Sequence, residues 1–324
     1  MKHAAAALLL FGCLWRAQDS KTLTLRTRVE LPDVAGRIDH FSADLTGNRL
    51  FIAALGNQTI EVLDVRKGKR LGTIRDVAEP QGVLVHSAAN RLFVACRKDG
   101  TVKIFEGGSL KLLETVNFSG NADNLRYDAR HNRVIVGYGG GALGFLDPDG
   151  KKIGEIPLGA HPESFQLELT GTRAFINVPG NREVQVADLV KNAIVARWPL
   201  GVALQNYPMA LDEKHRRLLI GCRLPARMHV IDIDTGKRVG SFEIARDTDD
   251  LFYDSKRNRV YVIGGGGSVD VLAREDSDHY THIEQIKTAP GARTGLFVAE
   301  WAQLFVAVPQ RDRQRCEVLV YDAK

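Results

Sequence analysis

The chain has 324 residues, of which 44% are hydrophobic and 26% charged, and this composition is typical of a soluble globular protein with one large domain or two medium ones. The formal net charge is only +5, and the basic residues are scattered through the turns. Both features argue against nucleic acid as a partner, because a nucleic-acid-binding domain gathers its basic residues on one face. Thirty-one glycines indicate many turns.

Residues 1–20 are expected to be an export signal. They contain a basic start and an apolar run, MKHAAAALLLFGCLW, that is too short to span a membrane. The tetrapeptide LFGC resembles a bacterial lipobox and would place a lipid anchor on Cys13. Cleavage near Ala17 would instead release a soluble protein. Either alternative predicts a periplasmic or cell-envelope location.

The rest of the chain repeats one pattern at intervals of roughly 42 residues. The pattern is clearest in GNRLFIAALGNQTIEVLDVRKGKRLGTI and ANRLFVACRKDGTVKIFEGGSLKLLETV, which contain a β-branched run, a turn, an alternating run, a second turn and a last strand. Each unit follows one more short strand, such as DNLRYD or DDLFYD. Four strands per unit, without helical periodicity, predict an all-β fold: a seven-bladed β-propeller with four antiparallel strands per blade.

The seven repeats are expected to form a single domain, residues 21–324. The last unit stops after its third strand, whereas TLTLRTRVEL, residues 22–31, alternates like a strand and belongs to no other unit. This N-terminal strand is expected to join the last blade and close the ring, which hides two sheet edges that would otherwise promote aggregation. The expected blades are about 36–78, 79–120, 121–159, 160–202, 203–246, 247–288, and 289–324 together with 21–32.

The chain resembles a known family in motifs such as RLFVACRKDGTVKIF and RAFINVPGNREVQVAD. These are similar to YVTN-type repeats, and the whole chain after the signal resembles the YncE-like β-propellers of exported bacterial proteins. The resemblance implies a seven-bladed propeller and export, but it implies little chemistry, because the activity of that family is mostly undefined. The sequence has no Trp-Asp dipeptide, which disfavours the intracellular WD type.

A binding site is expected where the innermost strands of the blades begin. In a propeller these strand starts converge with the ends of the second strands on one end of the central channel, where loops surround a cavity. The residues at these positions are strongly polar. The predicted ligand-binding residues are His40, Gln81, Asn124, Arg126, His161, Glu163, Asn206, Asp249, Asp250 and Arg293.

The mixed charges favour a binding protein whose polar channel takes a small charged ligand or a partner peptide. Arginines would pair with anionic groups, and carboxylates would accept cationic ones. For any single residue of this predicted site, the alternative to ligand binding is a purely structural role in a hydrogen-bond network between blades. No catalytic residue and no cofactor are predicted, because the sequence contains neither a Gly-x-Ser-x-Gly elbow nor an HExxH motif.

A metal-assisted lactone or ester hydrolase is the second functional alternative. Propeller lactonases use oxygen and imidazole ligands drawn from separate blades, and a divalent metal could be held in the same way by His40 and His161 with Asp39, Asp123, Glu163 and Asp250. The segment DTDD lacks the glycine and the distal glutamate of an EF-hand loop, so an EF-hand calcium site is not predicted there.

Three further patterns are interpreted as structural. The glycine-rich GGGALG, residues 139–144, lies between two predicted strands, so it is expected to be an interstrand turn and not a dinucleotide-binding loop. A carboxylate recurs five residues before an arginine, as in Asp44 and Arg49 or Asp128 and Arg133, and is interpreted as turn chemistry. Cys96, Cys222 and Cys316 are too widely spaced for a disulfide framework or a zinc cluster and are expected to be buried.

Overall fold

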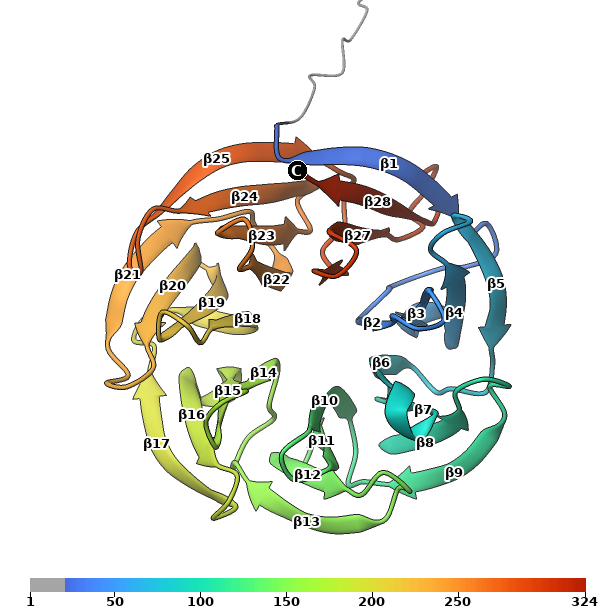
Figure 1. Ribbon diagram of the computed structural model, residues 1–324, viewed down its shortest axis with the longest axis horizontal. Helices are drawn as coiled ribbons and strands as arrows, with labels where there is room; N and C mark the ends of the chain where they lie inside the picture. Colours follow the sequence, from blue (N-terminus) through green and yellow to red (C-terminus); the bar gives the residue numbers. More distant parts are fainter. Residues whose placement is uncertain (1–20) are drawn as a thin grey trace, which may run out of the picture.

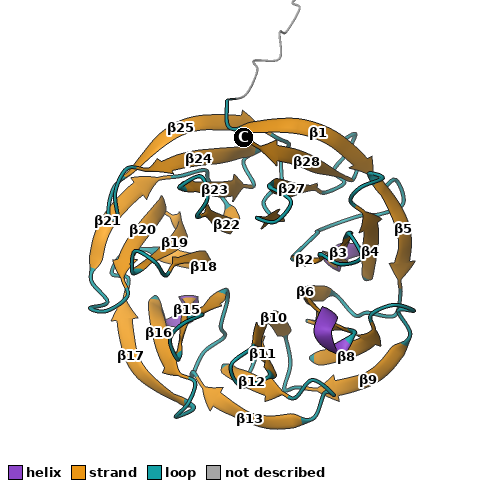
Figure 2. Ribbon diagram, in the orientation of Figure 1, coloured by secondary structure: helices purple, strands orange, loops and turns teal. Residues whose placement is uncertain are grey.

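The computed structural model describes residues 21–324, so the predicted export signal lies outside the described residues. Seven four-stranded antiparallel sheets are arranged in a ring (Figure 1), which confirms the predicted all-β, seven-bladed propeller. The helices within this range are single 3-10 turns at Leu55–Asn57 (η1), Ser87–Ala89 (η2) and Pro179–Asn181 (η3) (Figure 2). None of them has the length and apolar character needed to span a bilayer.

In the first six blades the strands follow one another from the ring axis outwards (Figure 1). Blade 1 contains β2 (Phe41–Asp44), β3 (Arg49–Ala54), β4 (Thr59–Asp64) and β5 (Lys69–Ile74). Blade 2 contains β6 (Pro80–His86), β7 (Arg91–Cys96), β8 (Thr101–Glu106) and β9 (Leu112–Asn117). Blade 3 contains β10 (Ala122–Asp128), β11 (Arg133–Tyr138), β12 (Ala142–Leu146) and β13 (Lys152–Pro157).

The next three blades repeat this order. Blade 4 contains β14 (Phe165–Leu167), β15 (Arg173–Val178), β16 (Glu183–Asp188) and β17 (Ala193–Pro199). Blade 5 contains β18 (Leu204–Asp212), β19 (Arg217–Leu224), β20 (Ala226–Asp232) and β21 (Arg238–Glu243). Blade 6 contains β22 (Thr248–Asp254), β23 (Arg259–Gly264), β24 (Ser268–Arg274) and β25 (Tyr280–Lys287).

Blade 7 combines the two ends of the described chain. It contains β26 (Gly295–Val298), β27 (Gln303–Val308) and β28 (Glu317–Ala323), and its outermost strand is β1 (Leu23–Glu30) (Figure 1). The β1–β28 pair is antiparallel and runs from Leu23 opposite Ala323 to Glu30 opposite Glu317. The predicted closure of the ring by the N-terminal strand is therefore confirmed.

The hydrophobic core lies between neighbouring blades. Every residue of β11 and β12 is buried. One apolar cluster joins Phe51 and Ile60 of blade 1 to Val83 and Val94 of blade 2. Because the middle strands are covered on both faces, their sequences are continuous apolar runs and do not alternate. The three cysteines of the described chain are buried and free, as expected: Cys96, Cys222 and Cys316.

The carboxylate–arginine pairs close hairpins between the first and second strands. Asp44 is opposite Arg49 in blade 1, and Asp128 is opposite Arg133 in blade 3. Their side chains form ion pairs of 2.8 Å and 2.9 Å. The structural interpretation of these two pairs is confirmed.

Four of the seven innermost strands are irregular where they begin. The ladder register shifts between Pro80 and Val83 in β6, Ala122 and Leu125 in β10, Asn206 and Met209 in β18, and Thr248 and Asp250 in β22. Each shift leaves an extra residue on the innermost strand, which is the definition of a β-bulge, and a bulge changes the direction of the side chains around it. Consecutive polar residues of the predicted site, such as Asp249 and Asp250, lie at these bulges.

Candidate functional site

Two cavities along the ring axis have linings that share no residue. The first has a volume of about 220 Å³ and lies where the innermost strands begin; we call it the mouth cavity. The second has a volume of about 400 Å³ and lies further along the same strands; we call it the channel cavity. The mouth cavity is lined by Arg37, Gln81, Arg97, Asn121, Asp123, His161, Glu163, Tyr207, Arg223, Asp249 and Arg293.

One side of the mouth cavity holds ion pairs centred on Asp249. Its carboxylate lies 2.6 Å from Arg223 and 2.9 Å from Arg293. A third guanidinium, that of Arg37, is 3.8 Å away. Asp247 also pairs with Arg223 and Arg293, at 3.3 Å in each case. The arginines on this side are thus matched by carboxylates within the protein, and their contacts join blades 1, 5, 6 and 7.

Blades 3 and 4 form a different side of the mouth cavity, where no ion pair within residues 21–324 joins Asp123 or Glu163 to an arginine. One oxygen or nitrogen atom each from Asp123, His161 and Glu163 lies within 4.8 Å of the other two. Asp123 Oδ2 is 3.5 Å from His161 Nε2. Burial, together with the charges of Asp123, Asp249 and Asp39, raises the pKa of Glu163 to about 8. Negative charge on this side therefore favours a proton or a cation.

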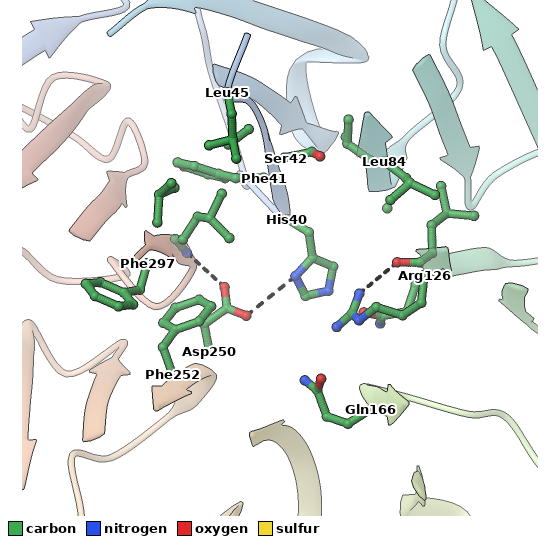
Figure 3. A pocket seen from close by; sticks show the side chains of 18 of the residues that line it. His40, Phe41, Ser42, Leu45, Leu84, Arg126, Gln166, Asp250, Phe252 and Phe297 are labelled. Atoms are coloured by element: carbon green, nitrogen blue, oxygen red, sulfur yellow. Dashed lines mark hydrogen bonds and ion pairs between the residues drawn. The ribbon is translucent and has the colours of Figure 1, made fainter. Parts of the chain in front are cut away.

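The channel cavity combines polar side chains with an apolar wall (Figure 3). Its polar side chains include His40, Asn124, Arg126, Gln166 and Asp250. Its apolar wall includes Phe41, Leu84, Leu125, Phe252, Leu296 and Phe297. The side chains of His40, Arg126 and Gln166 point from three blades toward the same space (Figure 3). Such a lining is typical of a small-molecule site, where apolar walls exclude water and a few polar groups orient the ligand.

His40 lies between two carboxylates. Its Nδ1 is 3.6 Å from Asp250, and its Nε2 is 3.7 Å from Asp39. The second oxygen of Asp250 accepts a hydrogen bond of 2.8 Å from the backbone N–H of Gly295 (Figure 3). Burial alone would lower the pKa of His40, but the two carboxylates raise it to about 10. His40 is therefore a cation at neutral pH.

Arg126 has a positive charge that no carboxylate of residues 21–324 contacts directly. Its Nη1 donates a hydrogen bond of 2.8 Å to the backbone oxygen of Leu125, and its guanidinium carbon lies 5.4 Å from the ring centre of Phe165. Burial lowers the pKa of Arg126, whereas Asp250 and Asp123 raise it from a greater distance. The channel cavity thus contains two cations, and only His40 is paired at close range.

The structure divides the predicted site residues between the two cavities. Gln81, His161, Glu163, Asp249 and Arg293 line the mouth cavity, whereas His40, Asn124, Arg126 and Asp250 line the channel cavity. Asn206 lines neither of the two. Its side chain is fully buried and donates to Asn177 Oδ1 at 3.0 Å and to the backbone oxygen of Glu183 at 3.2 Å. Asn206 therefore joins blade 5 to blade 4.

The sequence analysis did not identify the apolar wall of the channel cavity. Phe41, Phe252 and Phe297 come from the innermost strands of blades 1, 6 and 7. The only sequence feature that could have indicated this wall is an aromatic residue in a strand already predicted to lie beside the axis. Alternate residues of such a strand face the channel, but core packing uses the same apolar residue types, so the sequence does not distinguish the two environments.

The comparisons with known proteins agree with this architecture. No family model matches the chain, and no curated protein matches its sequence. A chain of the Mitotic Checkpoint Complex is 13% identical with a TM-score of 0.78, and the match covers 99% of both chains. The WD40 repeats of RRP9 are 11% identical with a TM-score of 0.79, over 95% of this chain and 99% of that one. A chain of Kuenenia stuttgartiensis hydrazine synthase is 13% identical with a TM-score of 0.73, over 85% and 94%.

At these identities the likeness shows the fold alone. The chain is a seven-bladed β-propeller with WD40-like structural neighbours. This fold is consistent with a binding or scaffold role, because its rigid ring presents cavities and loops around one axis.

Proposed function

We propose that this protein is an exported, YncE-like binding protein whose channel cavity takes a small organic anion with an apolar body. The observation that carries the proposal is Arg126, a half-buried guanidinium that points into the cavity and that no carboxylate of residues 21–324 contacts. A partly desolvated charge is less favourable without a counter-ion than with one. An anionic group of the ligand would supply the missing partner through charge-assisted hydrogen bonds.

The rest of the cavity supports the same ligand class. His40 adds a second positive charge, while Asp250 is already occupied by His40 and by the Gly295 N–H. Phe252 and Phe297 offer an apolar surface beside these charges. The volume of about 400 Å³ lies in the range of small-molecule pockets and favours a small ligand over a peptide chain.

Calorimetric titration of the full chain with matched small probes tests the proposal. Benzoate, phenylacetate and hexanoate are anions with an apolar body, whereas benzylamine and benzyl alcohol keep the ring but are cationic and neutral. We expect the carboxylates to bind and the other two to bind at least ~10-fold more weakly, since hydrogen bonds to charged groups contribute about 1.5–3 kcal/mol. Equal binding of all probes, or no binding of any carboxylate, would overturn the proposal.

Arg126→Gln should abolish most carboxylate binding. Because the substitution also removes a half-buried charge without a contacting carboxylate, the unliganded variant should unfold at the same temperature as the wild type or higher. Arg130→Gln is the matched control, since Arg130 is exposed and its guanidinium donates a hydrogen bond of 3.0 Å to the backbone oxygen of Thr170. Carboxylate binding that survives Arg126→Gln in a folded protein contradicts the assignment.

A metal-assisted lactone or ester hydrolase is the second candidate, and the cluster of Asp123, His161 and Glu163 favours it. Hydrolysis of simple lactones or aryl esters by purified protein should then stop when a chelator is added and return with metal. If no hydrolysis occurs with Zn²⁺ or Mn²⁺ present, this candidate is excluded for those substrates.

Export is part of the proposal and is supported by the segment MKHAAAALLLFGCLW. The mass of the mature protein from a bacterial envelope fraction would distinguish a lipid on Cys13 from cleavage near Ala17. An intact N-terminus in the cytoplasmic fraction contradicts export.

A further inference from the structure

The mouth cavity contains a group of metal-ligand side chains outside the proposed anion site. Asp123 is 1% exposed and comes from β10, while His161 and Glu163 come from the segment before β14. Their three candidate donor atoms lie within 4.8 Å of one another. Zinc–ligand bonds of about 2.0–2.2 Å place tetrahedral donor atoms roughly 3.3 Å apart. The Asp123–His161 separation of 3.5 Å is already close to that value.

Gln81 is an independent sign of a missing ligand in the same cavity. This residue is only 7% exposed and lines the mouth cavity, yet its Oε1 has no hydrogen-bond partner within residues 21–324. A buried amide oxygen without a partner destabilises the fold unless a ligand or water satisfies it. His161 Nδ1 is also buried there without a hydrogen-bond partner in the described chain. The Gln81 oxygen has lone pairs that a metal ion, or a water bound to it, would use, and the His161 imidazole can bind a metal through one nitrogen while the other carries its proton.

We propose that Asp123, His161 and Glu163 bind a divalent metal ion of the zinc and cobalt class in the mouth cavity. One imidazole nitrogen and two carboxylates suit Zn²⁺ and its first-row neighbours. Ca²⁺ requires six to eight oxygens, and Mg²⁺ keeps most of its waters, so neither matches this donor set as well. Three protein ligands facing a cavity leave a coordination position open, as in catalytic zinc sites.

This metal site does not depend on the proposed anion site. The two cavities share no lining residue, and the arginines of the mouth are paired with Asp249 and Asp247 on the other side. Arg126→Gln should therefore still bind one equivalent of metal, so failure of the anion proposal and failure of the metal proposal can be told apart.

Titration of the full chain with metal tests the inference. The protein is purified without a polyhistidine tag, stripped with a chelator and titrated with Zn²⁺ by calorimetry, with Mg²⁺ as the comparison ion. We expect one equivalent of Zn²⁺ and no comparable uptake of Mg²⁺. Co²⁺ should give a visible d–d absorption band that Zn²⁺ displaces. No stoichiometric uptake of Zn²⁺ or Co²⁺ at pH 7 and pH 9 would overturn the proposal.

Substitutions locate the bound ion. His161→Gln and Glu163→Gln should each weaken Zn²⁺ binding by at least ~10- to 100-fold, and both retain the shape of the mouth. His279→Gln is the matched control, because His279 pairs with Asp276 at 2.9 Å but is exposed and lies outside the cavity. Uptake that survives the first two variants, or that is lost in the control, places the ion elsewhere and contradicts the assignment.

Discussion

Replacing Asp250 with asparagine tests the charge of His40. Two unit charges about 3.6 Å apart attract by roughly 4.6 kcal/mol at an effective dielectric of 20, which raises a histidine pKa by about 3.4. Asp39 and Asp250 lie at 3.7 Å and 3.6 Å, so together they would raise the pKa by about 7. The pKa of about 10 requires burial to lower it by roughly half that amount.

Asp250→Asn removes one of these charges and keeps the size of the side chain. We expect the pKa of His40 to fall by roughly 3, to near neutrality. The assay is a pH titration by NMR of protein with ¹³C-labelled histidine, where the His40 signal is identified by its absence in His40→Gln. Asp149→Asn is the control, because the Asp149 side chain is 87% exposed and lies in the turn between β12 and the outermost strand β13 of blade 3. It should leave the His40 titration unchanged.

The raised pKa of His40 also links stability to pH. The folded chain holds this proton more tightly than the unfolded chain, so the stabilisation is fully present below about pH 6.5 and is lost as the pH rises through about 10. Affinity for carboxylate probes should decline through the same upper range. A His40 that titrates below about pH 8 in the wild type, or that shifts by less than about 1 in Asp250→Asn, would refute the reasoning.

Three more predictions follow from the mouth cavity and the ring closure. Asp249→Asn removes the closest carboxylate of Arg223 and Arg293, while Arg37 keeps Asp39 at 2.8 Å. It should lower the free energy of unfolding by about 1–3 kcal/mol in urea titrations, against less than about 1 kcal/mol for Asp149→Asn at an exposed position; equal losses would contradict this. The raised pKa of Glu163 should stabilise the fold fully below about pH 4.5, and this contribution should be lost as the pH rises through about 8. The unfolding temperature of Glu163→Gln should therefore depend less on pH between pH 5 and 9 than that of the wild type. Parallel profiles for the two proteins would refute the raised pKa. Deleting residues 21–31 exposes β28 as a sheet edge, so light scattering should detect oligomers, whereas a stable monomer would show that β1 is dispensable.

The sequence allowed nearly the whole fold to be predicted, because propeller architecture depends on local patterns. Apolar runs such as RLFVAC identify strands buried on both faces, and the leading short strands recur at a constant interval. Even ring closure was predictable, since TLTLRTRVEL alternates like an outer strand and the last repeat lacks one. Nothing in these patterns requires knowledge of distances between blades.

The site was less predictable, because it depends on depth along the axis and on contacts between blades. Asp249 and Asp250 are neighbours in the sequence, yet the bulge in β22 sends one to the arginines of the mouth and the other to His40 in the channel. Side-chain alternation assumes a regular ladder, so it does not predict that these two neighbours line different cavities.

The separation of neighbouring residues into two cavities explains why the sequence predicted a single site with both positive and negative charges. Once the bulges separate them, the unmatched charges have opposite signs in the two cavities: carboxylates near His161 in the mouth, and the guanidinium of Arg126 in the channel. A cation and an anion can therefore bind along one axis without competing for the same side chains. Because opposite charges in neighbouring cavities attract through the protein, filling one cavity should strengthen binding in the other, and Zn²⁺ should raise the affinity for benzoate more in the wild type than in His161→Gln.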